Sequence, residues 1–532
     1  MRVAVLGAGP SGLALCHYLR QTLGASLELT LVEASDRVGG WLRSERRDGF
    51  LFERGPHSFR PSTPAGKVVL ELVDDLGLRD EAITPAKGSG RRFLFLDGRI
   101  QEVAPSLRTP LGRTLLLGAL RDLCTASRAP GAALDAAGFR RFEAQLAAAT
   151  TPGERAAIRG VLDASDESVA GFVGRRFGTD LAEQAADAMV AGIFAGDARR
   201  LSARACFPLL PEFERDYGGV VWAMLRRSVL SGASKSPPPS GAREEWIAAL
   251  GATGQVSFRD GMETLARGLA ASFEAGGAQS RLLTGHRAVG LADAPRGDGA
   301  LDLTVASEAD GATEVIEADY VFSALPSAAL EPLLPSIPAT RAVRGALRDA
   351  PTVDVAVVNL GYDDGALLPH EGVGHLIPSR EWETALGVIW ASSVFPQQAA
   401  EGGRGGAGSA GETRLTVMMG GQHAHQAEVL ALESEAALVE HARSIVERHL
   451  GVTRPPTASI GGIHRNCIPQ YTVGHSARVE ELAGVLAEHR PRLRAIGNSL
   501  YGVGIADSIA VAQRTAEAFA RELELATPDS MQ

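Results

Sequence analysis

Glycines near the start of the chain have the spacing of a turn that binds phosphate groups. Residues 1–6, which are apolar apart from Arg2, lead directly into Gly7, Ala8, Gly9, Pro10, Ser11 and Gly12. Gly7 permits a tight turn from strand to helix, Gly9 lets the backbone approach a pyrophosphate, and Gly12 lets the helix pack closely on the strand. The N-terminus of the helix supplies free N–H donors. The pattern therefore predicts a dinucleotide-binding turn at residues 7–12.

The elements around this turn also have the expected spacing. We expect a helix at 13–23 and a second strand at 27–32, which leads directly into the acidic Glu33. In such an arrangement the carboxylate accepts a hydrogen bond from a ribose hydroxyl. A coincidental glycine turn is the alternative, because the glycine motif alone is a weak signal.

A second glycine pair, Gly39 and Gly40, indicates which dinucleotide is bound. The residues that surround the pair are Ala34, Arg37 and Trp41, and the segment Gly55, Pro56, His57 and Ser58 follows soon after. NAD enzymes have no need for a second glycine turn, whereas an extended flavin dinucleotide requires another close backbone approach to its diphosphate. The sequence therefore favours a flavin, with an ordinary Gly-Gly loop as the alternative.

The C-terminal region repeats the order of strand, glycine loop and helix. We predict a strand at 493–496, a loop that includes Gly497 and Asn498, and a helix from Ser508. Both ends of the chain are then expected to hold one cofactor.

With these motifs in place, the sequence resembles the FAD-dependent amine-oxidase-like superfamily and, within it, the protoporphyrinogen oxidase family of the mitochondrial, animal-type branch. The further segments that carry the resemblance are 92–96, 192–197, 201–202, 206–208, 374–378, 466–471 and 474–475. It extends from residue 1 to about residue 520 and thins at 125–165, 232–254 and 401–411. We interpret these three stretches as surface insertions or linkers, because small or Gly-rich sequence buries little apolar surface.

The resemblance implies non-covalently bound FAD and a set of cofactor contacts. These residues are Gly7, Ala8, Gly9, Pro10, Ser11, Gly12, Glu33, Ala34, Arg37, Gly39, Gly40, Trp41, Gly55, Pro56, His57, Ser58, Ala288, Asn498, Val503, Gly504 and Ile505. Ala288 would meet the adenine side, and the late residues would approach the flavin ring or the diphosphate. His57 and Asp507 could equally serve as cap or turn residues.

The resemblance also implies three two-electron oxidations of protoporphyrinogen IX to protoporphyrin IX, with O2 as acceptor and H2O2 as product. FAD carries this chemistry, so no side chain is expected to act as acid or base. Arg92 would pair with a propionate, Val373, Leu376 and Met418 would line an apolar slot, and Gly192 would border it. A surface arginine at a strand start is the alternative for Arg92, and Arg91 could share its role. Related enzymes usually carry an aromatic residue in place of Val373, which suggests a wider pocket.

Two other functions are compatible with the same motifs. One is a flavoprotein oxidase for coproporphyrinogen III, a polyamine or a carotene precursor. The other is a flavin-binding protein that has lost its oxidase activity. An amine oxidase would be expected to show an aromatic cage and a covalent flavin cysteine, and neither signal is clear.

The expected fold class is α/β, with an FAD-binding Rossmann-like domain of the amine-oxidase or p-hydroxybenzoate-hydroxylase type. This domain is expected to be discontinuous and to comprise 1–85, 255–322 and 485–525. An α+β substrate-binding domain is expected at 86–106, 223–254 and 323–484, with strands at 353–360 and 415–419. Residues 107–222 are rich in Leu, Ala and Arg at helical spacing, which predicts a helical domain.

Composition excludes several other classes. The formal net charge of −10 gives no electrostatic case for a nucleic-acid partner. The four cysteines, Cys16, Cys124, Cys206 and Cys467, are scattered singly, so we expect unpaired thiols and no metal site. The 12 histidines also lack metal-ligand spacing, and we interpret His423, His425 and His441 as surface positions.

No uncharged apolar run reaches the roughly 18 residues that a membrane-spanning helix needs. Segments 111–123 and 220–230 mix Arg with apolar residues, which is compatible with peripheral membrane contact or with ordinary helix packing. Because the first strand starts at Val3, we expect no cleavable presequence. The resemblance implies the mitochondrial inner membrane, or a plastid for a photosynthetic source. Homodimers are frequent in the family, and hand-off of the product to ferrochelatase is left open.

Overall fold

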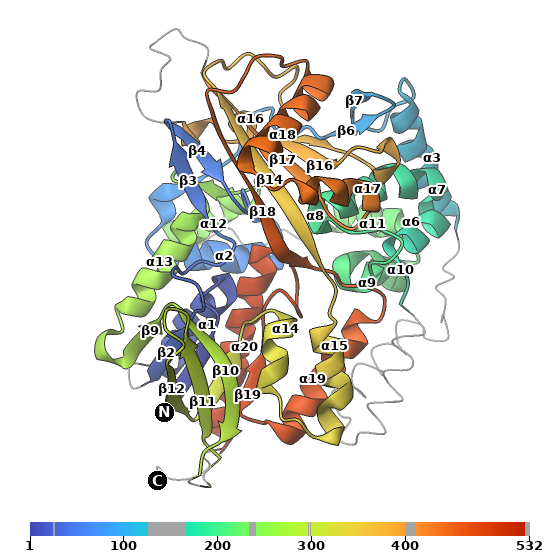
Figure 1. The fold of residues 1–532 in the computed structure, drawn as a ribbon. Helices are drawn as coiled ribbons and strands as arrows, with labels where there is room; N and C mark the ends of the chain where they lie inside the picture. Colours follow the sequence, from blue (N-terminus) through green and yellow to red (C-terminus); the bar gives the residue numbers. More distant parts are fainter. Residues whose placement is uncertain are drawn as a thin grey trace.

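The computed structural model describes residues 1–24, 27–125, 166–233, 241–295, 297, 299–399 and 411–526. In these residues a lower lobe surrounds a parallel sheet, an upper lobe surrounds a larger mixed sheet, and a group of helices lies beside the upper lobe (Figure 1). The α/β fold class expected from the sequence is confirmed. Most of the three stretches interpreted as insertions or linkers lies outside the described residues.

The lower sheet has five parallel strands in the order β19-β13-β1-β2-β9. They are β1 (Arg2–Leu6), β2 (Glu28–Val32), β9 (Ser280–Leu283), β13 (Tyr320–Ser323) and β19 (Leu493–Ala495). The strands predicted at the start of the chain, at 27–32 and at 493–496 are confirmed. Because chain segments far apart in sequence pair here, the carboxyl ends of β1, β2, β13 and β19 meet at one edge.

Four helices cover one face of this sheet: α1 (Pro10–Leu23), α2 (Pro64–Asp75), α13 (Glu263–Glu274) and α20 (Ile505–Ala526). Their apolar faces share one core with the sheet, in which Leu15, Leu265 and Phe519 are almost completely buried. The helix predicted at 13–23 is confirmed and begins earlier, at Pro10. The last helix begins at Ile505 rather than at Ser508.

The opposite face of the lower sheet is covered by a second layer. It consists of β10 (His286–Asp293), β11 (Leu301–Ser307), β12 (Thr313–Ala318), α14 (Ser327–Leu330), α15 (Arg341–Arg348) and α19 (His475–His489). The segments 327–348 and 475–484 therefore pack with the lower lobe, although the sequence assigned them to the substrate domain. The domain division stays a prediction. A division drawn by this packing would include these segments in the domain built on the lower sheet.

The upper sheet has seven strands in the order β18-β14-β17-β16-β15-β6-β7. They are β6 (Phe93–Leu96), β7 (Arg99–Glu102), β14 (Thr352–Tyr362), β15 (Gly374–Leu376), β16 (Ala385–Trp390), β17 (Thr413–Gly420) and β18 (Ala458–Pro469). Neighbouring strands are antiparallel except β15 and β6. The strands predicted at 353–360 and 415–419 are confirmed.

Helices cover both faces of the upper sheet. Helix α18 (Glu435–Leu450) buries Leu438, Ile445 and Val446 against one face. Helix α8 (Asp187–Phe194) places Ala188 and Ala191 against the other. The hairpin of β3 (Ser44–Arg47) and β4 (Phe50–Glu53) packs its phenylalanines on β18.

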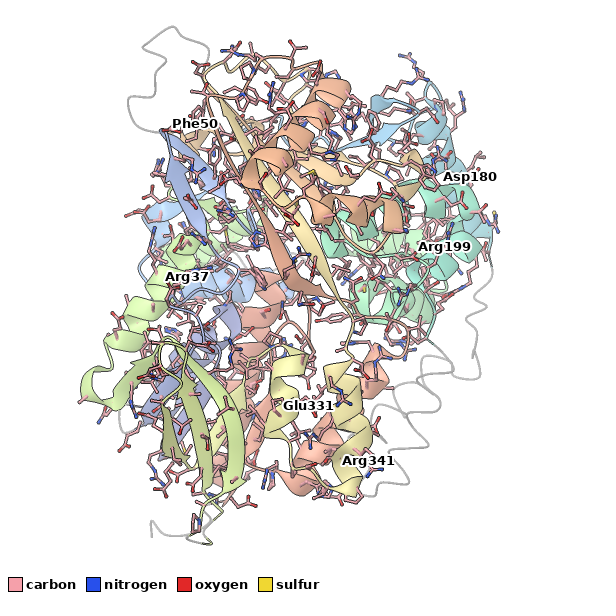
Figure 2. The ribbon with its side chains drawn as sticks, viewed as in Figure 1. Arg37, Phe50, Asp180, Arg199, Glu331 and Arg341 are labelled. Carbon is pink, nitrogen blue, oxygen red and sulfur yellow. The ribbon has the colours of Figure 1, made fainter. Side chains whose placement is uncertain are left out.

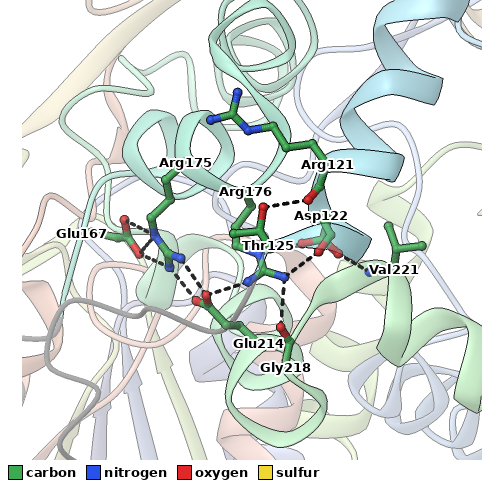
Figure 3. A network of polar contacts seen from close by, with 9 residues as sticks. All are labelled: Arg121, Asp122, Thr125, Glu167, Arg175, Arg176, Glu214, Gly218 and Val221. Carbon is green, nitrogen blue, oxygen red and sulfur yellow. Dashed lines mark hydrogen bonds and ion pairs between the residues drawn. The ribbon is translucent and has the colours of Figure 1, made fainter.

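The helical region is held together by buried charges. Its elements are α3 (Pro110–Cys124), α6 (Val169–Phe177), α7 (Thr179–Leu181), the π-helical turn Ala182–Ala186, α8, α9 (Ala203–Cys206), α10 (Leu209–Tyr217) and α11 (Val220–Ala233). The fully buried Arg176 lies 2.6 Å from Asp122 of α3 and 3.1 Å from Glu214 of α10 (Figure 3). Arg175 pairs with Glu214 at 2.5 Å and with Glu167 at 2.6 Å. The network thus joins helices that are distant in sequence.

The remaining elements are short or peripheral. They are β5 (Ala82–Ile83), β8 (Ser257–Phe258), α12 (Ala242–Gly251), α16 (Ala391–Val394), α17 (Ala424–Ala427) and the 3-10 turns Arg79–Glu81, Gly277–Gln279, Glu331–Leu333, Pro338–Thr340, Ser379–Glu381, Pro396–Gln398 and Glu428–Ala431. Helix α12 corrects the interpretation of 232–254 as an insertion or linker. Ile247 is buried in the core beside α2, and Arg243 pairs with Asp74 and Asp75.

In the part of the chain that the structure describes, no helix combines the length and the apolar character needed to cross a bilayer.

Candidate functional site

The first glycine turn has the backbone geometry that the sequence predicts. Gly7 has φ of +93°, and its N–H donates to the Val32 carbonyl at 2.8 Å. A Cβ on Gly12 would lie 1.9 Å from the Gly7 carbonyl oxygen, so no side chain fits where α1 meets β1. Gly9 has open space at its Cβ position, with its nearest neighbour Gly40 Cα at 3.9 Å. The turn can therefore accept a ligand against its backbone.

The N-terminus of α1 faces the same edge of the sheet. Gly9 is the N-cap and provides no side-chain acceptor, and Pro10 occupies the first turn. Helix geometry leaves the N–H groups of Ser11 and Gly12 without an acceptor inside the helix. These donors and the helix dipole favour an anionic group at this point.

Glu33 lies directly after β2, and protein groups occupy part of its carboxylate. One oxygen accepts from the Ala8 N–H at 2.8 Å, and the other accepts from the backbone N–H and the hydroxyl of Ser35 at 2.9 and 2.7 Å. A carboxylate offers about four lone-pair positions, so capacity for a ribose hydroxyl remains. Sequence reasoning missed Ser35, which holds this carboxylate in place.

Ala34 and Ala288 line one cavity of about 110 Å³ beside the carboxyl ends of β1 and β2. Its other walls are Leu6, Val32, His286, Arg287, Leu325, Ala329 and Pro332. The structure thus brings together two predicted cofactor contacts that are distant in sequence, of which Ala288 was expected on the adenine side. The cavity is mostly apolar, which suits a flat aromatic base.

The second glycine pair packs directly against the first turn. Gly39 and Gly40 have φ of +105° and +54°, and the Gly39 N–H donates to the Ala8 carbonyl at 2.7 Å. A Cβ on Gly40 would lie 3.0 Å from Gly9 Cα. The two predicted backbone approaches therefore form one continuous surface without side chains.

Arg37 holds the loop that carries this pair. Its guanidinium donates to the carbonyls of Val38 and Leu42 at 3.1 and 3.3 Å and also to that of Gly40. Figure 2 shows Arg37 beside α13, below the hairpin that carries Phe50. A direct cofactor contact of Arg37 stays a prediction, and the structure gives it a loop-fixing role.

The segment 55–58 lies against this loop. A Cβ on Gly55 would lie 2.0 Å from the Trp41 carbonyl oxygen, and Trp41 is 42% exposed and packs edge-on against His464. Pro56 and Ser58 flank His57, whose carbonyl accepts from the Ser257 hydroxyl at 2.8 Å. Burial, with a smaller contribution from Arg414, lowers the pKa of His57 to about 4. Its Nε2 has no partner among the described residues, so a ligand can satisfy it.

The C-terminal loop lies beside the first glycine turn, although it comes from the other end of the chain. Gly497 has φ of +102°, and its Cβ position is 3.4 Å from the Ala324 carbonyl oxygen. The Cβ position of Gly7 is 3.3 Å from the same oxygen. Asn498 begins the loop, and Val503, Gly504 and Ile505 lead into α20. Two helix N-termini and three glycine approaches therefore converge, which fits an extended dinucleotide with a diphosphate.

Asp507 lies in the first turn of α20, beneath this loop. Its Cβ and Cγ would be 2.5 and 3.1 Å from a Cβ on Gly502, so the aspartate fills the space that this glycine leaves. Burial raises its pKa above the usual range. Of the two readings left open by the sequence, the position of Asp507 favours a turn residue.

Three of the predicted substrate residues meet between α8 and the upper sheet. Leu376 of β15 and Met418 of β17 both pair with Gly387 of β16, so the three residues form one row across the sheet. A Cβ on Gly192 would lie 2.4 Å from Leu376 Cδ2. Met418 packs near Ala191 and Ala195 of the same helix region. The row and the helix form an apolar wall made largely of small residues.

Sequence reasoning missed Gly387. A Cβ there would lie 2.8 Å from the His375 carbonyl and 3.0 Å from Leu376 Cδ2, so a side chain would fill the row. The available signal was a glycine inside an apolar strand, which marks a close approach.

Arg92 and Val373 lie together at the start of β6 and β15, away from this row. Val373 donates to the Arg91 carbonyl at 2.9 Å and packs with Ile83, Val394 and Phe395. Arg92 is exposed and makes no ion pair with any described residue. Arg91 instead makes a bidentate pair with Glu102 at 2.9 and 2.6 Å. The suggestion that Arg91 shares the role of Arg92 stays a prediction, and in the structure its guanidinium pairs with Glu102.

The opposite side of β15 carries a buried histidine pair that the sequence did not indicate. His375 Nε2 lies 3.0 Å from His449 Nδ1, and His449 Nε2 lies 3.5 Å from Glu383. Phe95 stacks on His449 at 3.7 Å between ring centroids. Burial and then His449 hold the pKa of His375 well below its usual range. The pair packs behind β15, the strand that carries Leu376.

The three histidines that the sequence singled out lie outside the apolar row. His423, His425 and His441 are partly buried, which corrects their interpretation as surface positions. His423 packs on His425, and His441 bonds the Thr384 hydroxyl at 2.7 Å. The four cysteines are unpaired, as expected. Among the described residues, no group of three or more His, Cys, Asp or Glu side chains is placed to hold a metal ion.

Comparison with known proteins identifies the class of molecule to which this site belongs. The family model described as flavin containing amine oxidoreductase matches residues 10–519. The chain is 34% identical to protoporphyrinogen oxidase from Bos taurus, over 95% of this chain and 96% of the relative. It is 26% identical to coproporphyrinogen III oxidase from Bacillus subtilis, over 95% of each chain.

A solved structure shows the same fold at lower sequence identity. Cyclohexylamine oxidase from Brevibacterium oxydans matches with a TM-score of 0.62 and 15% identity, over 98% of this chain and 99% of that chain.

Proposed function

This chain belongs to the flavin containing amine oxidoreductase family, and from that premise we propose that it oxidises protoporphyrinogen IX to protoporphyrin IX. The chain is an FAD-binding flavoprotein and an oxidoreductase. The observation that carries the proposal is 34% identity to protoporphyrinogen oxidases over nearly the whole of both chains. Coproporphyrinogen III is the second candidate substrate, supported by the weaker identity of 26% to a full-length relative of that name.

Bound FAD supplies the chemistry, because it accepts electron pairs from the substrate and passes them to O2 with formation of H2O2. The protein must bind a large apolar ring and keep titratable groups away from it. The row of Leu376, Gly387 and Met418 presents such a surface opposite α8. We propose that this row contacts the tetrapyrrole.

The arginines before β6 bear on how many substrate carboxylates the protein can pair. Arg92 is available to a propionate, whereas Arg91 is neutralised by Glu102. Protoporphyrinogen IX carries fewer propionates than coproporphyrinogen III, so it requires fewer cations such as Arg92. A charge-assisted bond of this kind contributes about 1.5–3 kcal/mol.

The test compares both substrates in air with the purified holoprotein. Porphyrin fluorescence and peroxide would be recorded together, and we expect about three peroxides per porphyrin if each electron pair passes to O2. The kcat/KM for protoporphyrinogen IX should exceed that for coproporphyrinogen III by about tenfold, which corresponds to about 1.4 kcal/mol. A reversed ratio would assign the second candidate. Porphyrin formation without peroxide would exclude O2 as acceptor.

We also propose peripheral membrane contact through α3 and α11, at the mitochondrial inner membrane or, for a photosynthetic source, in a plastid. Leu117 is 66% exposed, Leu120 58% and Trp222 50%, and Arg113 and Arg226 accompany them. Exposed apolar residues beside cations are typical of interfacial helices. Flotation with anionic vesicles tests this, and a Leu120→Asp, Trp222→Asp variant should stay in the unbound fraction. Homodimer formation and hand-off of product to ferrochelatase are further proposals that rest on the resemblance alone.

A further inference from the structure

The turn between β18 and α19 contains a sequence motif that the function described so far does not use. It includes Gln470, Tyr471 and His475, which belong to segments that carry the family resemblance. Tyr471 is 2% exposed and Gln470 is 4% exposed. Buried polar side chains in an irregular turn require partners, and the partners identify what this turn does.

The Tyr471 hydroxyl joins both ends of the loop that is expected at the flavin ring. It donates to the Asn498 carbonyl and accepts from the Gly502 N–H at 2.8 Å. Gly502 has φ of +92°, so the loop turns sharply at the point of this bond. One hydroxyl therefore fixes two backbone groups that lie four residues apart.

His475 holds the middle of the same loop. Its ring stacks on Tyr471 with 3.9 Å between centroids and an angle of 17° between planes. Its Nε2 lies 3.0 Å from the Leu500 carbonyl, which can only accept, so Nε2 carries the proton. The Tyr471–His475 pair thus fixes three backbone positions of the loop, 498, 500 and 502.

The other side of the turn contacts the helix that borders the apolar row. Gln470 Nε2 donates to the Phe194 carbonyl at the end of α8 at 2.7 Å. The Tyr471 carbonyl accepts from the Ser202 N–H at 2.8 Å. The turn therefore connects the loop before α20 with the end of α8.

We infer that Tyr471, with His475 stacked on it, is a positioning residue that fixes the loop 498–504 against the flavin. Gln470 anchors the same turn to α8. The loop has no regular secondary structure of its own, so its conformation depends on these side chains. Supports of this kind hold a binding surface within the narrow tolerance that a cofactor ring needs. The inference rests on FAD binding by this loop and does not depend on which porphyrinogen is the substrate.

The test is the substitution Tyr471→Phe, which keeps the ring, its burial and its stacking and removes the hydroxyl. Tyr18→Phe is the matched control, because Tyr18 is 3% exposed and its hydroxyl has no partner among the described residues. FAD affinity of the apoprotein, the visible absorption and circular dichroism of the bound flavin, and its reduction potential would be measured. For Tyr471→Phe we expect FAD binding to weaken about tenfold, the effect of about one lost hydrogen bond, together with altered flavin spectra. Tyr18→Phe should match the wild type.

A second variant covers the case in which Tyr471→Phe does not fold. His475→Phe keeps an aromatic ring in the stack and loses the bond to Leu500, and it should also weaken FAD binding and change the flavin spectra. Urea unfolding of each apoprotein separates loop positioning from general stability. Unchanged FAD affinity and spectra in a folded variant, with or without a loss of stability, would overturn the inference. These readouts need no porphyrinogen, so a wrong substrate assignment would leave their outcome unaffected.

Discussion

At the scale of single residues, this site is defined mainly by the absence of side chains. Gly12, Gly40, Gly55 and Gly387 each lie where a Cβ would be 3.0 Å or closer to a neighbouring atom. Such approaches let backbone N–H groups and flat ring surfaces come close to a ligand. Few charged side chains belong to the site, and Arg92 is the one proposed to contact the substrate.

Substitution of Gly12 by alanine should abolish FAD binding, because the new Cβ would lie 1.9 Å from the Gly7 carbonyl oxygen and force α1 away from β1. Gly174→Ala is the control, since this helical glycine has open space at its Cβ position and alanine favours helix. Flavin content after purification and an FAD titration of the apoprotein would measure the effect. Full flavin content in folded Gly12→Ala would contradict the proposed close packing.

Removal of the Arg92 guanidinium should mainly weaken substrate binding. We expect Arg92→Ala to raise KM for protoporphyrinogen IX by about 10- to 100-fold, from a loss of about 1.5–3 kcal/mol, with a smaller change in kcat. Arg91→Ala should change KM little, because that guanidinium pairs with Glu102. Steady-state kinetics of both variants measure these changes. Equal increases in KM would argue against a specific role of Arg92.

The residues of the glycine turns could be predicted from sequence because their geometry is local. Gly7, Gly9 and Gly12 act within one strand-to-helix turn, whose spacing is fixed by covalent structure. Gly387 and Tyr471 could not be predicted in this way. Their roles arise only when β15, β16 and β17 align, or when residue 471 meets residue 502, and no local pattern encodes those pairings.

At the scale of secondary structure, the helical region depends on buried ion pairs. Arg176 joins α6 to α3 and α10 and also donates to the Gly218 carbonyl at 3.0 Å (Figure 3). The sequence predicted helices here from their apolar spacing, but periodicity does not indicate which charges become buried. The last helix begins at Ile505, three residues before the predicted start at Ser508.

Removal of one member of this network should destabilise the helices strongly. We expect Arg176→Met to lower the free energy of unfolding by about 3–5 kcal/mol, because Asp122 and Glu214 lose a partner inside the protein. The control is Arg443→Met, which breaks an exposed pair with Glu440 on α18 and should cost less than about 1 kcal/mol. Urea unfolding followed by circular dichroism measures both. Similar losses for the two variants would show that the buried network has no special role.

At the scale of the whole molecule, the lower lobe is assembled from distant parts of the chain. Its parallel sheet takes strands from residues 2–6, 28–32, 280–283, 320–323 and 493–495. The discontinuous arrangement was predicted because both ends of the chain carry phosphate-binding turns. The packing of α12, α15 and the first two-thirds of α19 (residues 475–484) on this lobe was not predicted, since amphipathic helices do not specify which sheet they cover.

Buried histidines should make the whole fold sensitive to acid. Burial lowers the pKa of both His57 and His475 to about 4, with smaller contributions from neighbouring groups. The unfolded chain binds these protons below about pH 6.5 and the folded chain only near pH 4, so the free energy of unfolding should fall as pH decreases through this interval. Urea unfolding of the apoprotein between pH 7 and pH 4.5 tests this. His57→Gln should lose less stability over that range than the wild type, and an identical decline would be inconsistent with a buried, neutral His57.

The most direct test of the central claim is anaerobic mixing of the FAD-loaded protein with protoporphyrinogen IX while the visible flavin absorption is followed. We expect rapid bleaching of the flavin, with about three equivalents of flavin reduced per porphyrin formed and recovery of the absorption when O2 is admitted. Slower bleaching by coproporphyrinogen III is expected in parallel. A flavin that stays oxidised with protoporphyrinogen IX would contradict the proposed reaction, although the chain would remain a member of this flavoprotein family.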